Sequence, residues 1–263
     1  MSEAPSTVAT LMYHELSQEW PRDRYGVSVS NFEAQMQALA DAGYVGLSIA
    51  DFLGARAAGR RAVLLTFDDG YASDVELTLP VLQKHGFTAT FFITTGRIGE
   101  AGRISNAQIV TLHRSGMEIG CHGHTHEFLD TMQGAELQFE LTEPRRVISA
   151  LTGIEPAAMS LPGGRQSAQT VAKIWEAGYR VLGTSVPSSQ VQILSGNRRV
   201  FGRIPMIRSQ TPANIVAIAG CGPLTRARNM ARYQVAALLK RALGGAQYYR
   251  VWKMLSRGKR DPV

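Results

Sequence analysis

The sequence predicts an α/β fold in which parallel strands alternate with helices. Apolar runs of strand length alternate along the chain with segments whose apolar residues recur at helical spacing. Two of these runs lead directly into polar clusters, Asp68-Asp69-Gly70 and His122 to His126. Functional residues at the carboxyl ends of strands are typical of α/β enzymes. At 263 residues and 44% apolar content, the chain can bury one large core, so we expect one enzyme domain with an appendage.

The elements are expected to follow one another as repeated strand–helix units. The first part should contain strand 8–12, helix 31–42, strand 45–49, helix 49–58, strand 62–67, helix 106–115 and strand 117–120. In the first helix, Ser30 is the expected N-cap and Gly43 the expected stop. The second part should contain helix 136–152, interrupted near Pro144, strand 157–161, helix 170–177 and strands 179–184 and 201–207. Parallel pairing of these strands places their carboxyl ends at one catalytic edge.

Two adjacent carboxylates, Asp68 and Asp69, follow strand 62–67. They repel each other in a low dielectric, and a metal ion is the usual compensation, with one carboxylate as ligand and the other handling protons. Three of the six histidines lie within five positions, at His122, His124 and His126. Alone, Asp-Asp-Gly fits a helix-capping turn equally well, and a histidine pair fits an exposed helix face. Together, after two strand-like runs, they favour a two-histidine, one-carboxylate metal site with open coordination positions.

These residues carry a resemblance to the polysaccharide deacetylase family, the NodB-homology carbohydrate esterases. Residues 66–70, Thr-Phe-Asp-Asp-Gly, match the family's first motif, and His122 and His126, preceded by Ile-Gly, match its second. Residues 79–93 resemble the family's helix-then-strand segment. The resemblance is strong from about Val8 to Gly164 and fades afterwards. It implies an irregular, incomplete (β/α) barrel, TIM-like, with about seven parallel strands.

The resemblance also implies residue roles. Asp69, His122 and His126 would hold a divalent metal, and Asp68 would be the general base. Zinc is the first expectation, with cobalt, nickel or iron as alternatives, since two imidazoles and a carboxylate suit all of them. His124, between the ligands, is expected to face substrate or solvent. We expect Cys121 to be a small buried hydrophobe rather than a ligand.

The third family motif departs from its usual form. The family has an arginine there that orients the base, ahead of a proline–aromatic–glycine turn, whereas this chain has Ser160 at the arginine position. Arg165 is the available arginine nearby, and we expect it to reach Asp68 as the replacement. The glycine-rich turn keeps a backbone N–H available for an oxyanion hole. The residues of this stretch expected to contact substrate are Pro162, Gly163, Gly164 and Arg165.

The family's late histidine, its general acid, is missing, because no histidine follows His126. His14, at the end of strand 8–12, is the best replacement, with a structural histidine as the alternative. Tyr13 beside it is expected to contact substrate, as Tyr-His openings occur in exopolysaccharide-type members. Ser185, after strand 179–184, is expected to line the cleft.

The net charge of +7 is concentrated at the carboxyl end. Residues 223–263 contain ten Lys or Arg and one acid, so residues 1–222 carry −2. We therefore divide the chain into a catalytic domain, 1–222, and a basic amphipathic helical extension, 223–263. Such helices either lie on anionic membranes or pack on the barrel with their basic sides in water. No nucleic-acid recognition motif is present.

The sequence contains no 18-residue apolar stretch, and residues 1–7 have no basic or apolar leader pattern. With only two cysteines, these features favour a cytoplasmic protein, with the inner face of the membrane as a variant. The predicted function is metal-dependent removal of an N-acetyl group from an amino sugar of a glycan or a lipid-linked precursor. The alternatives are a related C–N hydrolase, acting on formamides or cyclic amides, and a catalytically weak glycan-binding protein.

Overall fold

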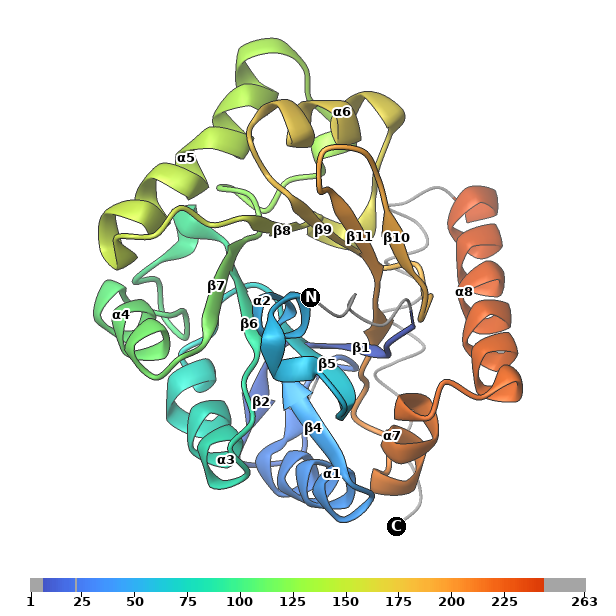
Figure 1. Ribbon diagram of the computed structural model, residues 1–263. Helices are drawn as coiled ribbons and strands as arrows, with labels where there is room; N and C mark the ends of the chain where they lie inside the picture. The colour runs from blue at the N-terminus through green and yellow to red at the C-terminus, as the bar shows by residue number, and fades with distance from the viewer. Residues whose placement is uncertain (1–6, 22, 244–263) are drawn as a thin grey trace.

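The structure, a computed structural model, describes residues 7–21 and 23–243. Within them, a ten-stranded sheet curls into a half-barrel with helices around its outside (Figure 1). The strand order is β10-β11-β9-β8-β7-β6-β5-β1-β12, and β4 pairs with β5 off this path. The strands are β1 (Thr10–Tyr13), β4 (Tyr44–Leu47), β5 (Arg61–Phe67), β6 (Thr90–Ile93), β7 (Glu118–Cys121), β8 (Ala158–Ser160), β9 (Val181–Thr184), β10 (Val191–Ile193), β11 (Arg199–Gly202) and β12 (Ile204–Pro205).

The pairing confirms the (β/α) barrel class. Each pair in this sheet is parallel except β10 with β11, so the carboxyl ends of the parallel strands share one edge. The sheet has ten strands rather than the expected seven or so, and two of the ten, β10 and the short β12, lie at its ends. Two further strands, β2 (Leu16–Ser17) and β3 (Val27–Ser28), form a separate parallel pair.

Aromatic side chains fill the layer between the sheet and the helix that contains Phe32. Phe67 of β5 stacks between Tyr13 of β1 and Phe91 of β6, with ring centroids 5.2 and 4.8 Å away. Phe32 packs its edge against both Tyr13 and Phe67. All four side chains are buried, as expected for parallel strands covered on both faces.

The helices lie outside the sheet except the short helix Ile49–Leu53, which is seen at the centre of the ring of strands (Figure 1). They are α1 (Val29–Asp41), α2 (Ile49–Leu53), α3 (Leu79–Lys84), α4 (Asn106–Arg114), α5 (Gly134–Thr152), α6 (Ala168–Glu176), α7 (Pro212–Ala219) and α8 (Pro223–Leu243). The first helix begins earlier than expected, because the hydroxyl of Ser28, not Ser30, accepts the capping hydrogen bond from the backbone N–H of Asn31. Gly43 follows it with a φ of 76°, a left-handed conformation that favours glycine.

Two other expectations were wrong in detail. Pro144 lies inside α5 without interrupting it, because Leu137, Leu141 and Ile148 bury one continuous face on both sides of it. The expected strand 201–207 is instead β11 and β12, because the chain changes partner at Arg203: β11 pairs with β9, and β12 pairs with β1. The side chain of Arg203 enters the barrel at this crossing.

The basic extension begins as α8, and its remainder, 244–263, lies outside the described residues. Three large apolar side chains of α8, Leu224, Val235 and Leu238, are 86%, 57% and 64% exposed. Among the described helices, none has the length and apolar character needed to cross a membrane.

Candidate active site

Three potential metal ligands meet at the carboxyl edge of the sheet. Asp69 follows β5, and His122 and His126 follow β7, two strands away. One ligand atom from each residue lies within 4.8 Å of the others. The Oδ1 atom of Asp69 is 3.0 Å from Nε2 of His126 and 3.4 Å from Nε2 of His122. Two imidazole nitrogens and one carboxylate oxygen converging on one point are a donor set that fits a divalent transition metal.

The backbone at these ligands is held in an uncommon conformation. Asp69 and His126 have φ angles of 80° and 69°, although neither is glycine. Positive φ at non-glycine residues persists only where surrounding contacts determine it, and it is found often at functional sites.

Contacts with Ser160 fix the orientation of the His122 ring. Its Nδ1 lies 2.5 Å from Oγ and 3.2 Å from the carbonyl oxygen of Ser160, on β8. This pairing assigns the proton to Nδ1 and leaves Nε2 as a lone-pair donor facing Asp69. Ser160, which stands where the family has an arginine, thus orients a histidine.

The loop that carries the histidines is held by a buried carboxylate of α5. Glu140, 2% exposed, accepts hydrogen bonds from the backbone N–H of His124 at 2.7 Å and of Thr125 at 3.1 Å, and from the Thr125 hydroxyl at 2.7 Å. The ring of His124 contacts Thr95 and Phe139 rather than the three ligands. Cys121 is buried and burial raises the pKa of its thiol to about 12, as expected for a hydrophobe.

Asp68 is clamped by an arginine that sequence reasoning missed. Nη1 of Arg203 donates to Oδ1 of Asp68 at 2.6 Å, and Nη2 donates to Oδ2 at 2.8 Å. Both residues are buried, and Arg203 is completely covered, with its guanidinium over the ring of Phe92. Glycine at 183 makes room, since a Cβ there would lie 3.1 Å from Nε of Arg203.

Burial alone would raise the pKa of Asp68, but the charges and hydrogen bonds of Arg203 and the charge of His122 outweigh it. The net result is a pKa below the usual value, so Asp68 is ionised at neutral pH. Burial likewise raises the pKa of Asp69, and the neighbouring imidazoles of His122 and His126 reverse the shift.

The expectation that Arg165 reaches Asp68 was wrong. Arg165 pairs instead with Asp130, Nε and Nη2 both lying 3.0 Å from Oδ2, and covers the ring of Phe128. The signal that could have found the right residue is an arginine inside the apolar run 201–207. A charge at such a position is buried and needs a partner of opposite charge.

His14 lies at the end of β1, within electrostatic reach of both aspartates. Its Nδ1 is buried and has no hydrogen-bond partner among the described residues, and its ring lies 5.2 Å from that of Tyr25. Burial lowers the pKa of His14, and the charges of Asp68 and Asp69 only partly oppose this. The expected substrate contact at Tyr13 was wrong, because Tyr13 is fully buried and its hydroxyl donates to Oε1 of Gln35 at 2.8 Å.

The glycine-rich turn lies at the same edge. Gly163 and Gly164 have φ angles of 62° and 66°, and a Cβ on either would collide with Phe128 or Ser185 respectively. The Ser185 hydroxyl lies 3.9 Å from the sulfur of Met12. Pro162, Gly163, Gly164 and Ser185 therefore stand beside the site, and their contact with substrate stays a prediction.

Comparison with known proteins agrees with this geometry. Residues 55–182 match the family model described as polysaccharide deacetylase. This match confirms the resemblance to the polysaccharide deacetylase family that the motifs predicted. A Bacillus subtilis protein assigned to these deacetylases, YxkH, is 27% identical over 72% of this chain and 68% of its own length.

A second relative is the poly-β-1,6-N-acetyl-D-glucosamine N-deacetylase of Staphylococcus aureus, which is 32% identical over 38% of each chain. The fold is similar to that of the Streptococcus pyogenes deacetylase PplD, which was solved in complex with acetate. The TM-score is 0.71, and the two sequences are 22% identical over 82% of this chain and 99% of the PplD chain. The matched region of the family model includes β5 and β7, which carry the three potential ligands, but ends before Arg203.

Proposed function

We propose that this protein is a metal-dependent hydrolase that removes an N-acetyl group from an amino sugar. The observation that carries the proposal is the arrangement of Asp69, His122 and His126 beside a second carboxylate, Asp68, that is held ionised by Arg203. Amide hydrolysis needs an activated water, an electrophile for the carbonyl oxygen, a base and an acid. These residues supply the metal site and the base.

Asp69, His122 and His126 would hold the metal. A divalent metal bound there supplies Lewis acidity, lowering the pKa of water and polarising the acetyl carbonyl. Zinc is the first candidate, with cobalt, nickel or iron as alternatives, because the donor set suits each of them.

Asp68 takes the proton of the attacking water. The bidentate contact with Arg203 fixes both carboxylate oxygens, so the base keeps one orientation. The N–H of Gly164 donates to the carbonyl of Leu161 at 2.9 Å, so the candidate donor to the oxyanion in this turn is the N–H of Gly163.

His14 gives a proton to the leaving amine. Its unpartnered Nδ1 is available for this transfer, and the charges of Asp68 and Asp69, which oppose the effect of burial on its pKa, favour the protonated ring that the transfer needs. His124 and Arg165 are left as substrate contacts at the rim.

The substrate is an acetylated amino-sugar glycan or its precursor. The S. aureus relative is named for deacetylating poly-β-1,6-N-acetyl-D-glucosamine, which supports this class. A weak glycan-binding protein was a reasonable alternative while the base lacked an arginine. The contact between Arg203 and Asp68 argues against that alternative, which rested also on the missing late histidine.

The basic extension 223–263 would hold the catalytic domain 1–222 at the inner face of the membrane, close to a lipid-linked precursor. The exposed Leu224, Val235 and Leu238 of α8 support an interfacial helix, and the two free cysteines suit the cytoplasm. The prediction is salt-sensitive sedimentation with anionic vesicles that is lost when the extension is removed. Binding that survives this removal, or no binding at low salt, would contradict the membrane role.

The test of the activity is mass spectrometry of acetylated glucosamine oligomers after incubation with metal-loaded protein. Loss of acetyl mass, abolished in Asp68→Asn, is the expected result. Intact oligomers, with turnover of formamides or cyclic amides instead, would favour the related C–N hydrolase.

A further inference from the structure

A pocket of about 320 Å³ lies between α7, α8 and the segment that follows β12. It is separate from the candidate active site and shares no residue with it. Its lining includes Gln210 and Asn214 on one side and Arg228 and Arg232 of α8 on the other. Its volume is at the lower end of the range for small-molecule sites.

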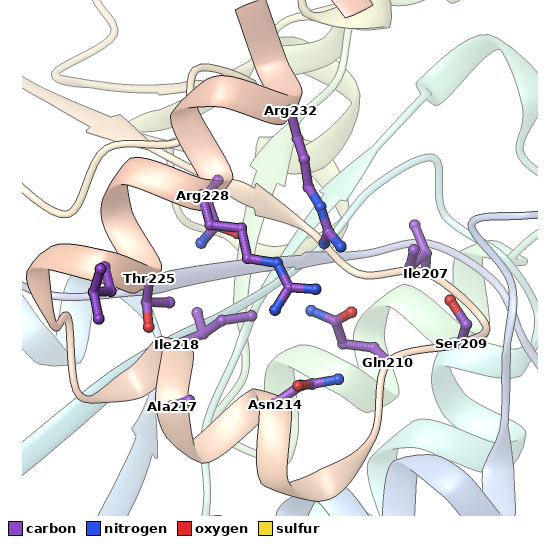
Figure 2. Close-up of a pocket in the computed structure, with 11 residues that line it drawn as sticks. Ile207, Ser209, Gln210, Asn214, Ala217, Ile218, Thr225, Arg228 and Arg232 are labelled. Carbon is purple, nitrogen blue, oxygen red and sulfur yellow. The ribbon is translucent and has the colours of Figure 1, made fainter. Parts of the chain in front are cut away.

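Two guanidinium groups converge on this pocket. Figure 2 shows the side chains of Arg228 and Arg232 directed from α8 into the space in front of Gln210. The side-chain amides of Gln210 and Asn214 lie on the opposite wall (Figure 2). The pocket therefore presents N–H donors from two sides.

The positive charge in the pocket is not neutralised locally. None of the described residues that line it is Asp or Glu. Partial burial lowers the pKa of Arg232, and the charges of Arg228 and Arg24 lower it further, so these arginines repel one another. A bound anion would relieve this repulsion and would accept the fork-like donors of both guanidinium groups.

The pocket is connected to the catalytic edge. The backbone carbonyl of Gln210 accepts a hydrogen bond from Nε2 of Gln35 at 2.8 Å, and Gln35 accepts from the Tyr13 hydroxyl, one residue before His14. In the same wall, the backbone N–H of Arg208 donates to the carbonyl of Arg24 at 2.9 Å, and Tyr25 next to it contacts His14. An anion in the pocket would thus lie behind the loops that carry His14.

We propose that this pocket binds a phosphate group, held by Arg228 and Arg232 against the amides of Gln210 and Asn214. Phosphate is favoured over a carboxylate because it offers more oxygens and more charge to two guanidinium forks. The phosphate belongs either to a soluble phosphorylated molecule or to a lipid headgroup. This proposal does not depend on the proposed amide hydrolysis, since no pocket residue belongs to the candidate active site.

The test is calorimetric titration of full-length, metal-loaded protein with inorganic phosphate at constant ionic strength. Arg228→Gln and Arg232→Gln should each weaken phosphate binding by about tenfold or more, as expected for loss of a charged hydrogen bond. Arg226→Gln is the matched control, because Arg226 is an exposed arginine of α8 that does not line the pocket, and it should bind phosphate as the wild type does. Phosphate bound at the metal would be common to all variants and cancels in the comparison.

A second arm distinguishes the two sources with vesicles of phosphatidylcholine containing phosphatidylglycerol. If a headgroup is the ligand, vesicle binding falls more in Arg228→Gln and Arg232→Gln than in Arg226→Gln, which removes the same charge from α8. If a soluble phosphate is the ligand, only the phosphate titration separates these variants. Equal effects of all three substitutions on both probes, in variants that melt at the wild-type temperature, would overturn the proposal.

Discussion

Two stretches of the chain contribute to the site in different ways. In the stretch from β5 to β7, the residues that face the metal position come from short contiguous motifs at two strand ends. In the stretch from β8 to β12, the contributions are single residues, Ser160, Ser185 and Arg203, that share no motif. Arg203 reaches Asp68 across 135 positions of sequence. Local motifs therefore define the potential ligands, whereas the partner of the base depends on how the chain closes the barrel.

The largest expected effect separates the two neighbouring aspartates. Asp68→Asn should abolish turnover while leaving metal bound, because it removes the base and no ligand. Asp69→Asn or His126→Ala should lose metal and activity together. Metal content by elemental mass spectrometry, measured beside turnover, checks this. Loss of metal from Asp68→Asn would mean that the two roles are reversed.

The next largest effect on kcat distinguishes Arg203 from Arg165. Arg203→Lys keeps the charge but loses the bidentate fork, so Asp68 is misplaced and kcat should fall on the order of 10²-fold. Arg165→Lys, at the rim beside Asp130, should change KM rather than kcat. Steady-state kinetics of both variants distinguish these outcomes. A larger fall in kcat for Arg165→Lys would contradict the assignment.

An effect of similar size on turnover is expected from substitution of His14. His14→Ala should lower turnover on the order of 10²-fold or more, as expected for removal of a general acid, with metal content unchanged. A variant with near-normal turnover would make His14 a structural residue.

A smaller effect is expected from the carboxylate behind the histidine loop. Glu140→Gln removes the charge that holds the backbone of His124 and Thr125, so metal affinity should weaken about 10- to 100-fold. Glu143→Gln is the matched control, because Glu143 lies on the same helix but pairs with Arg146 at the surface. Competition with a chelator measures both. Equal metal affinities in the two variants would show that Glu140 does not position the histidine loop.

The sequence was sufficient for the barrel class and for bringing Asp69, His122 and His126 together, because each depends on local patterns. Strand runs followed by polar residues reveal the catalytic edge wherever strands are parallel. The sequence was insufficient for Arg203, since its position depends on the change of strand partner between β11 and β12. The sequence-based prediction for Tyr13 was also wrong. Side chains alternate in direction along β1, so Tyr13 points into the aromatic core, whereas its neighbour His14 lies at the catalytic edge of the sheet.

The central claim is that two distant stretches of the chain meet where Arg203 pairs with the base, Asp68. A double-mutant cycle on these two residues tests it most directly. Arg203→Met in the wild-type background leaves a buried, unpaired carboxylate and should lower the free energy of unfolding by about 3–5 kcal/mol. In an Asp68→Asn background the same substitution should cost much less, because no charge remains to be left unpaired. Denaturant unfolding of the four proteins gives the coupling energy. Equal costs in the two backgrounds would show that Arg203 does not act on Asp68 and would contradict the account.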